Sequence, residues 1–169
     1  MKKIRKDKIT GQLFAIKQIY LDESEDFDDN EIRSEILALL SCDHDHIIKY
    51  HKSSVTNESE SNRPVLSIFM DYCKYGSLRQ IIDRYGAIPE NLVKDIAWEI
   101  LTALNYLHQQ GIGHCDLKAA NVLVDEKGRI KIGDFGVSIN PFTSNYPIVS
   151  LVGSPYWMAP ELITKFQQK

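Results

Sequence analysis

Alternating apolar and polar positions predict several strands in the first half of the chain. Leu13–Tyr20 alternates loosely, is rich in β-forming residues, and follows the turn pair Thr10–Gly11, as a hairpin strand does. Ile47–Tyr50 and Val65–Met70 are two further apolar runs of strand length. The polar segment between them, Ser53–Arg63, predicts a surface loop.

Two segments have the periodicity of amphipathic helices. The first runs from about Asn30, a residue that can cap it, to Leu40. The second runs from Pro89, which is favoured in a first helical turn, to about Gln109. Its apolar positions share one face and are Ile96, Ile100, Ala103, Leu104 and Leu107.

A small hairpin is predicted in the second half of the chain. Val122–Val124 and Ile130–Ile132 have strand composition, and Asp125–Gly128 between them has turn composition. Beyond Phe135 the many prolines indicate loops. Strands and one helix therefore come first, and a helical region with a small hairpin follows. This order predicts an α+β architecture with two unlike lobes.

Composition excludes several classes of protein. The chain has 169 residues, a net charge of −3 and a pI near 5.9, so it has no general attraction for nucleic acid or for an anionic membrane. No apolar run approaches the length of a membrane span. The three cysteines, Cys42, Cys73 and Cys115, are an odd number without close pairs, which argues against a disulfide framework or a zinc site. We therefore expect a cytoplasmic protein.

The strongest chemical signal lies in residues 114–121, HCDLKAAN, and residues 134–136, DFG. A loop and a short hairpin bring Asp116, Asn121 and Asp134 near one another. Carboxylate and amide oxygens suit Mg²⁺, and a carboxylate not bound to metal can orient a hydroxyl and accept its proton. Lys118 beside them can neutralise a transferring phosphoryl group.

These motifs resemble the catalytic loop and metal-binding motif of the protein kinase family. The resemblance implies that Asp116 is the catalytic base and that Lys118 contacts the γ-phosphate. It also implies that Asn121 and Asp134 are the Mg²⁺ ligands, and that ATP is the cofactor. A tripeptide DFG alone could arise in any turn, but its order behind Asp116 and Asn121 is specific.

The resemblance extends to the strand that carries Lys17. Residues 14–17, FAIK, are similar to the family's Val-Ala-Ile-Lys strand, which implies that Lys17 holds the α- and β-phosphates. Its expected partner is a glutamate on the next helix. The family's usual spacing back from Ile47–Tyr50 selects Glu35, and Glu31, a first-turn acid that favours the helix dipole, is the alternative.

Residues 70–73, MDYC, resemble the gatekeeper and hinge of the family. The resemblance implies that Met70 closes the back of the adenine pocket, and that the Asp71 carbonyl and the Cys73 backbone hydrogen-bond adenine. Ala15 and Leu123 would then sandwich the adenine ring. The alternative is that Met70, Asp71 and Cys73 are an ordinary strand end, and that Ala15 and Leu123 are ordinary core residues.

Residues 153–161, GSPYWMAPE, resemble the substrate-docking loop of kinases, in the version of the germinal-centre and MAP-kinase-cascade groups. Lys118 and Ser154 together favour serine and threonine hydroxyls of proteins as substrates. Ser150 aligns with the activating phosphosite of those groups, which implies an upstream kinase as a partner. The alternative is that Ser150 is an ordinary exposed hydroxyl, one of several in this segment, and the sequence favours the phosphosite only slightly over it.

The sequence departs from the family in extent. It begins at the strand of Lys17 and ends soon after Glu161, so we expect a two-lobed kinase-like fold truncated at both ends, without a Gly-rich loop or the large C-terminal helical base. Residues 1–72 would form a partial N-lobe and residues 73–169 a partial C-lobe. The function rivals are a catalytically impaired kinase-like scaffold and an inactive gene fragment.

The first prediction concerns Cys115, which stands where most family members have an arginine that helps to receive the loop phosphate. Because a cysteine cannot bind phosphate bidentately, Ser150→Ala should retain most of the parent's phosphotransfer activity. Steady-state rates of the two proteins check this. A near-complete loss of activity would contradict it.

Overall fold

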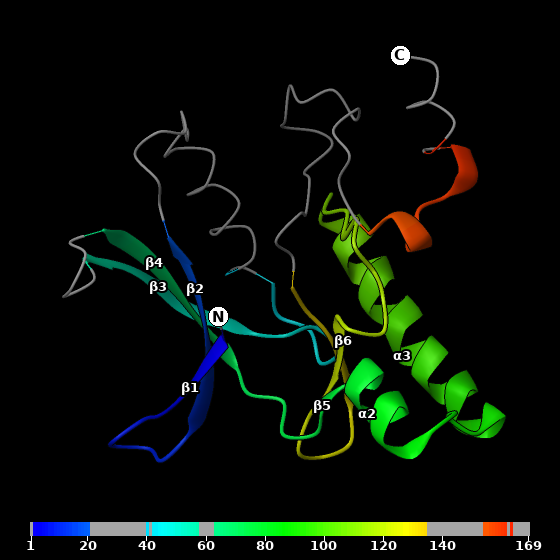
Figure 1. Cartoon of the computed structure of the whole chain (residues 1–169), viewed down its shortest axis with the longest axis horizontal. Coiled ribbons are helices and arrows are strands. Elements are labelled where there is room, and N and C mark those ends of the chain that lie inside the picture. The colour runs from blue at the N-terminus through cyan, green and yellow to red at the C-terminus, as the bar shows by residue number, and fades with distance from the viewer. Residues whose placement is uncertain are drawn as a thin grey trace.

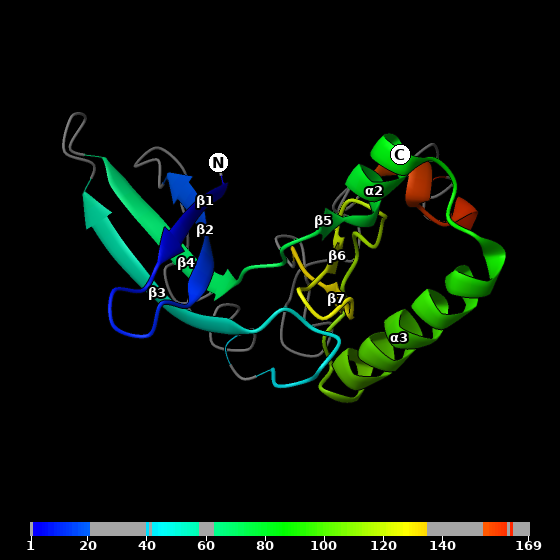
Figure 2. The same ribbon diagram turned by 90° about the horizontal axis from the view of Figure 1, so that it is seen from below.

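The computed structural model describes residues 2–20, 40, 42–57, 63–134, 154–161 and 163. Figure 1 shows a strand-rich part that contains the N-terminal elements and a helix-rich part that follows it, and Figure 2 shows the chain crossing between them after β4. The α+β architecture with two unlike parts is thus confirmed. The predicted helix from Asn30 lies outside the described residues, except for its last residue, Leu40.

The strand-rich part is a four-stranded antiparallel sheet in the order β1-β2-β4-β3. Its strands are β1 (Lys2–Lys6), β2 (Leu13–Tyr20), β3 (Tyr50–Asn57) and β4 (Pro64–Asp71). The bounds of β2 are those predicted. β1 was not predicted: the strand of Lys17 is preceded by another strand, whose sequence KKIRK has a single apolar residue and therefore no alternation.

The prediction of a surface loop from Ser53 to Arg63 was wrong in its first part. Residues 53–57 belong to β3, which pairs with β4 through Asn57↔Pro64. Every residue of β3 after Tyr50 is exposed, and the strand lies at the edge of the sheet. An edge strand that buries neither face has no alternation of apolar and polar residues from which it could be predicted.

The helix-rich part contains a second, three-stranded sheet and two helices. Its strands are β5 (Gly76–Ser77), β6 (Val122–Val124) and β7 (Ile130–Ile132), paired antiparallel in that order. The helices are α2 (Leu78–Tyr85) and α3 (Glu90–Gln109), and a 3₁₀ turn, η1, covers Pro155–Trp157. The bounds of β6 and β7 are those predicted, and Pro89 is the residue just before α3 rather than in its first turn.

Helix α2 was not predicted, although its start is marked in the sequence. Ser77 caps it, since the Ser77 hydroxyl accepts a hydrogen bond from the Gln80 N–H and the Gln80 side chain accepts one from the Ser77 N–H. This reciprocal pair is a capping box. The helix is amphipathic but only eight residues long, and Leu78 is its one buried residue; the capping box is the sequence signal that could have identified it.

Residues 46–48 join the two sheets. The Ile48 N–H donates to the Ile132 carbonyl at 2.9 Å, and the Ile132 N–H donates to the His46 carbonyl at 2.9 Å. In place of the predicted strand Ile47–Tyr50, the structure has a single β-bridge between Ile47 and Ile132 of β7, and Tyr50 begins β3. The four largest fully buried side chains lie at this junction and beneath it: Ile47, Ile48, Leu107 and Ile132. One core thus extends across both parts of the molecule.

Apolar side chains are also exposed in the helix-rich part. Trp98 and Leu101 on α3 are 73% and 61% exposed, and Tyr156 in η1 is 95% exposed. Within the described residues, no helix has the length and apolar character that a membrane crossing requires.

The second prediction concerns Asp125, which closes the turn between β6 and β7 and is 6% exposed. Burial alone would raise the pKa of its carboxyl, but hydrogen bonds from the Arg129 N–H, the Arg129 guanidinium and the Lys127 N–H outweigh burial and lower it. Because the folded pKa lies below the unfolded one, ionised Asp125 stabilises the fold above the unfolded pKa. That stability is lost as pH falls through the folded pKa.

Asp125→Asn should therefore lower the free energy of unfolding by about 1–2 kcal/mol at neutral pH, and the difference should shrink below about pH 4. Urea denaturation at several pH values measures both effects. The control is Asp83→Asn, which alters an exposed i,i+4 pair with Arg79 and should change little. A deficit that persists unchanged in acid would contradict the prediction.

Candidate active site

The loop between α3 and β6 carries the candidate catalytic residues. Gly111, with φ of 71°, ends the helix. The Nε2 atom of His114, which is 3% exposed, lies 3.2 Å from the Gly133 carbonyl and ties the loop to the chain just before Asp134. Burial lowers the pKa of His114, which favours the neutral ring. Burial and the contact with the Gly133 carbonyl give His114 a structural role in the loop.

Asp116 is the centre of a hydrogen-bond network. Its Oδ2 atom lies 2.8 Å from the Lys118 Nζ and accepts a hydrogen bond from the Asn121 Nδ2 at 3.0 Å. Its Oδ1 atom accepts hydrogen bonds from the Ser154 N–H at 3.0 Å and the Ser154 hydroxyl at 2.8 Å. The loop and the distant 154–161 segment thus meet on one carboxylate.

This network sets the charge of Asp116. Burial disfavours the ionised carboxylate, but the hydrogen bonds from Lys118, Ser154 and Asn121 outweigh that effect and lower the pKa of Asp116. The Lys118 Nζ also donates to the Ser154 hydroxyl. A serine hydroxyl therefore lies between the carboxylate and the ammonium group, where a proton acceptor and a positive charge converge on an alcohol oxygen.

Lys17 connects the first sheet to this site. Its Nζ atom lies 2.6 Å from the Asp134 Oδ1, and both side chains are partly exposed, at 27% and 29%. Asp134 has φ of 65°, a left-handed conformation that is uncommon outside glycine. The sequence had paired Lys17 with Glu35, and that residue, like Phe135, lies outside the described residues.

The two expected metal ligands are joined through the backbone. Asn121 directs its Nδ2 to the Asp116 carbonyl and carboxylate, which leaves its side-chain oxygen for another ligand. The Gly133 N–H donates to the Asn121 carbonyl at 3.0 Å, so Asn121 is tied to the residue before Asp134. An amide oxygen and a carboxylate are ligands that suit Mg²⁺, which keeps water or phosphate oxygens in its shell.

No group of three or more His, Cys, Asp or Glu side chains suited to a metal ion occurs among the described residues. His44 and His46 accordingly have structural contacts. The His46 Nδ1 lies 3.0 Å from the Ile130 carbonyl and 3.1 Å from the Glu99 Oε2, and the His44 ring stacks on Tyr106. Residues 44–46 are thus a polar loop whose two histidines contact neighbouring residues of the fold.

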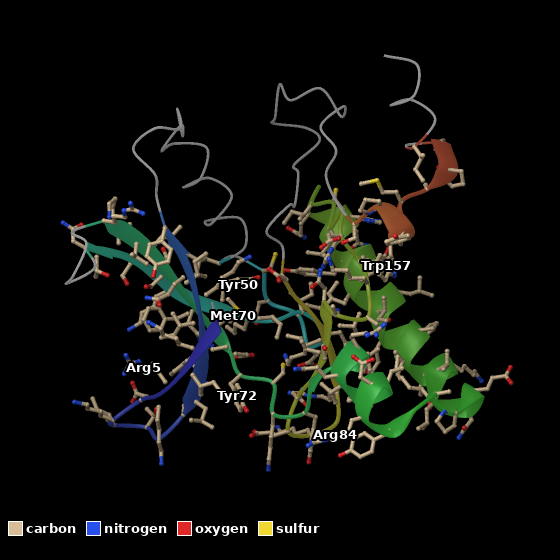
Figure 3. All side chains as sticks on the ribbon, in the orientation of Figure 1. Arg5, Tyr50, Met70, Tyr72, Arg84 and Trp157 are labelled. Atoms are coloured by element: carbon tan, nitrogen blue, oxygen red, sulfur yellow. The ribbon has the colours of Figure 1, made fainter. Side chains whose placement is uncertain are left out.

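The residues expected around adenine come from both sheets. Ala15 pairs with Met70 in the register of β2 and β4, and Met70 is buried; Figure 3 shows Met70 near Tyr50 and Tyr72, where the two parts of the molecule meet. Cys73 is also buried. Leu123 packs against the same core from β6. The structure thus brings these residues to the junction of the two sheets.

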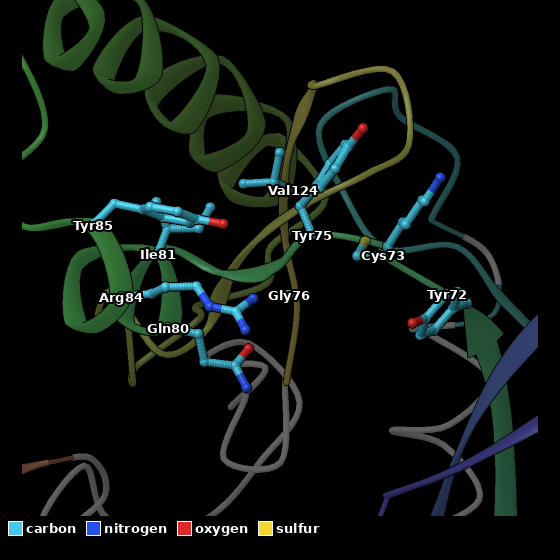
Figure 4. Close-up of a pocket in the computed structure, with 10 residues that line it drawn as sticks. Tyr72, Cys73, Tyr75, Gly76, Gln80, Ile81, Arg84, Tyr85 and Val124 are labelled. Atoms are coloured by element: carbon cyan, nitrogen blue, oxygen red, sulfur yellow. The ribbon is translucent and has the colours of Figure 1, made fainter.

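A cavity of about 700 Å³ lies beside the hinge, towards α2 (Figure 4). Tyr72, Tyr75, Ile81, Arg84 and Val124 are among its lining residues. Neighbouring residues on a strand point to opposite faces, so Val124 and Leu123 face different sides of β6. The cavity nevertheless shares Cys73 with the residues expected around adenine, and the sequence did not indicate it.

Comparison with known proteins identifies the family. The family model for the protein kinase domain matches residues 3–169. The chain belongs to the protein kinase family. Its fold is accordingly the two-lobed kinase fold, and the resemblance seen in the sequence motifs is confirmed. Members of this family generally use ATP and Mg²⁺ and act on proteins.

The similar curated proteins are much longer than this chain. Cell division control protein 7 of Schizosaccharomyces pombe is 44% identical over 155 residues, which are 90% of this chain and 14% of that protein. Cytokinesis protein sepH of Aspergillus terreus is 42% identical over 91% of this chain and 11% of its own length. MAP3K epsilon protein kinase 1 of Arabidopsis thaliana is 40% identical, with coverage of 90% and 11%.

These relatives agree with the expected likeness to serine/threonine kinases of the MAP-kinase-cascade type. Sequence reasoning missed two contacts in the site. Ser154 was taken as a marker of substrate type, but its direct hydrogen bonds to Asp116 were not foreseen, and neither was the pairing of Lys17 with Asp134. Both contacts join residues far apart in the sequence, and no local pattern signals them.

Proposed function

We propose that this chain transfers the γ-phosphate of ATP to serine and threonine hydroxyls of proteins, with Mg²⁺ as the metal. The proposal rests on one observation: the side chains of Lys118, Asn121 and Ser154 all lie within hydrogen-bond distance of the Asp116 carboxylate. Such catalysis depends mainly on positioning and charge stabilisation. The chain spans 14% or less of the relatives described above, so the activity of the whole protein belongs to this proposal.

Asp116 and Lys118 are the proposed catalytic residues. A carboxylate with a lowered pKa stays ionised at neutral pH and can orient a substrate hydroxyl and accept its proton. Lys118 places a positive charge beside the same oxygen, where negative charge develops on the transferring group. The position of the Ser154 hydroxyl supports this assignment, because it shows that an alcohol oxygen fits between the two groups.

Lys17, Asn121 and Asp134 are proposed to hold the nucleotide phosphates and the metal. Asn121 and Asp134 would supply oxygens to Mg²⁺ and Lys17 would bind the α- and β-phosphates, with Glu35 as its partner. The metal supplies neutralisation of phosphate charge when bound. The contact between Lys17 and Asp134 supports this assignment, since it places a phosphate-binding cation beside a metal ligand.

The adenine site is proposed at the junction of the two sheets. Met70, Asp71 and Cys73 would form its back and its hydrogen-bonding edge, and Ala15 and Leu123 its two apolar faces. Residues 1–72 then act as the N-lobe and residues 73–169 as the C-lobe. The burial of Met70 and Cys73 beside partly buried Ala15 and Leu123 supports this arrangement.

The proposed partners are protein substrates and an upstream kinase that acts at Ser150, which lies outside the described residues. The composition supports no partner among nucleic acids and no membrane association. The three cysteines, an odd number without close pairs in the sequence, support a reducing, cytoplasmic location.

A second candidate function is a kinase-like binding module without phosphotransfer. One observation favours it: Lys17 and Asp134 pair directly at 2.6 Å, and this contact must be exchanged for phosphate and metal before catalysis. Cys115 in place of the family's arginine points in the same direction. MgATP binding without transfer to any protein would support this candidate.

The third prediction separates the two candidates. In the full chain, Asp116→Asn should lower phosphate transfer by about 10²–10⁴-fold, because the amide cannot accept the hydroxyl proton. The MgATP affinity should remain within about threefold of the parent, because Asp116 does not hold the nucleotide. Radiolabel transfer and calorimetry measure the two quantities.

The matched control is Asp83→Asn, an exposed acid paired with Arg79 on α2. This variant should match the parent in both measurements. Unchanged turnover in Asp116→Asn would refute the assignment of the catalytic base. Absence of transfer in the parent itself, with MgATP still bound, would favour the binding module.

A further inference from the structure

A buried lysine outside the proposed catalytic network lies behind the hinge. Lys131 on β7 is 7% exposed, and its Nζ atom donates to the Ile47 carbonyl at 3.3 Å. Its Nζ atom also lies 3.8 Å from the Asp71 Oδ2. A buried ammonium group is costly unless it is paired and hydrogen-bonded. Asp71 is thus a counter-ion for Lys131, from the end of β4.

His51 approaches the same carboxylate from the other side. Its Nε2 atom lies 2.7 Å from the Asp71 Oδ1. The Asp71 carboxylate is therefore contacted through one oxygen by a residue of the first sheet and through the other by a residue of the second sheet. We name His51, Asp71 and Lys131 together the Asp71 clamp.

A β-bulge places His51 in the clamp. Tyr50 pairs with Met70 and Lys52 pairs with Phe69, so His51 is an extra residue in β3. A bulge redirects the side chain of the inserted residue and is common beside active sites. The His51 ring packs edge-on against Phe14, with ring centroids 4.9 Å apart, and Phe14 is the β2 partner of Asp71. The ring is therefore held on two sides.

We propose that His51 and Lys131 are positioning residues, which fix the hinge at Asp71 so that its backbone presents a defined edge to adenine. The Asp71 N–H already donates to the Lys49 carbonyl at 3.0 Å, and the chain leaves β4 at this residue to cross to β5 (Figure 2). Side chain and backbone are thus fixed where the hinge begins. The inference rests on the proposed ATP-binding function and adds residues that the family motifs do not assign.

The clamp makes two predictions, which form the fourth test. The first concerns the full chain without nucleotide. Asp71→Asn, which keeps the shape but removes the charge, and Lys131→Met, which keeps the length but removes the cation, should release the hinge. Amide hydrogen exchange in residues 72–76 should become about tenfold faster. His51→Leu should also make exchange faster. His51→Gln, which keeps a side-chain N–H, should exchange as slowly as the parent.

The second prediction compares ATP with ITP, which carries an oxygen where ATP carries its exocyclic amine. A fixed hinge edge should favour ATP, and loosening it should weaken ATP binding by roughly tenfold with a smaller loss for ITP. The discrimination between the two nucleotides, measured by calorimetry with Mg²⁺, should therefore fall in Asp71→Asn and Lys131→Met. A purely structural role would weaken both nucleotides equally.

Matched controls come from the exposed pair formed by Lys49 and Asp43, whose side chains are 50% and 79% exposed. Lys49→Met and Asp43→Asn make the same chemical changes and should leave both readouts unchanged. Unchanged hinge exchange in Asp71→Asn and Lys131→Met overturns the clamp. Equal losses for ATP and ITP overturn its positioning role.

Failure of the proposed function has a different signature. If the parent chain binds neither nucleotide, ATP binding is refuted and the positioning role for adenine falls with it. The exchange measurement, which uses no nucleotide, then still decides whether His51 and Lys131 hold the hinge. His51 lies on the exposed edge strand β3, so its variants remain informative even if a change at buried Lys131 prevents folding.

Discussion

The candidate site depends on the hydrogen bonds that converge on Asp116. Lys118 and Asn121 come from the same loop, whereas Ser154 comes from a segment far along the chain. The carboxylate is held ionised by these groups despite its burial. Without such donors, burial would raise the pKa of Asp116 and disfavour its ionised form. The same contacts therefore determine the geometry of the site and its chemistry.

The packing between the two sheets determines whether the site can form. Residues 46–48 bond to Ile132 of β7, and His114 reaches Gly133, the next residue along. Asp134 follows directly and meets Lys17 from β2. The fully buried isoleucines at this junction, Ile47, Ile48 and Ile132, thus set the distance between Lys17 and Asp134, which are proposed to bind phosphate and metal.

Sequence patterns predicted those parts of the fold in which packing is visible locally. β2, β6 and β7 have the predicted bounds because their residues are of strand type and are flanked by turn residues. β1, β3 and α2 were missed or misplaced, since two are polar edge strands of the first sheet and one is a short helix with one buried residue. Their existence depends on neighbours that are distant in the sequence.

Sequence motifs named the residues of the candidate site but could not indicate their contacts. Short motifs placed Asp116, Lys118, Asn121 and Asp134 in the loop and beside the hairpin where the structure has them. The partners of these residues could not be predicted, because rotamers depend on the assembled core. The bulge at His51 is a further example: one inserted residue redirects a side chain towards the hinge, and no sequence motif marks it.

The most direct test of the account is the Mg²⁺ dependence of ATP binding by the full chain and its Lys17→Met variant. Lys17 and Asp134 are argued to exchange their mutual contact for phosphate and metal. Calorimetry should therefore show one ATP site that tightens with Mg²⁺ and is weakened at least tenfold in Lys17→Met. ATP binding that ignores both Mg²⁺ and the loss of Lys17 would contradict the account.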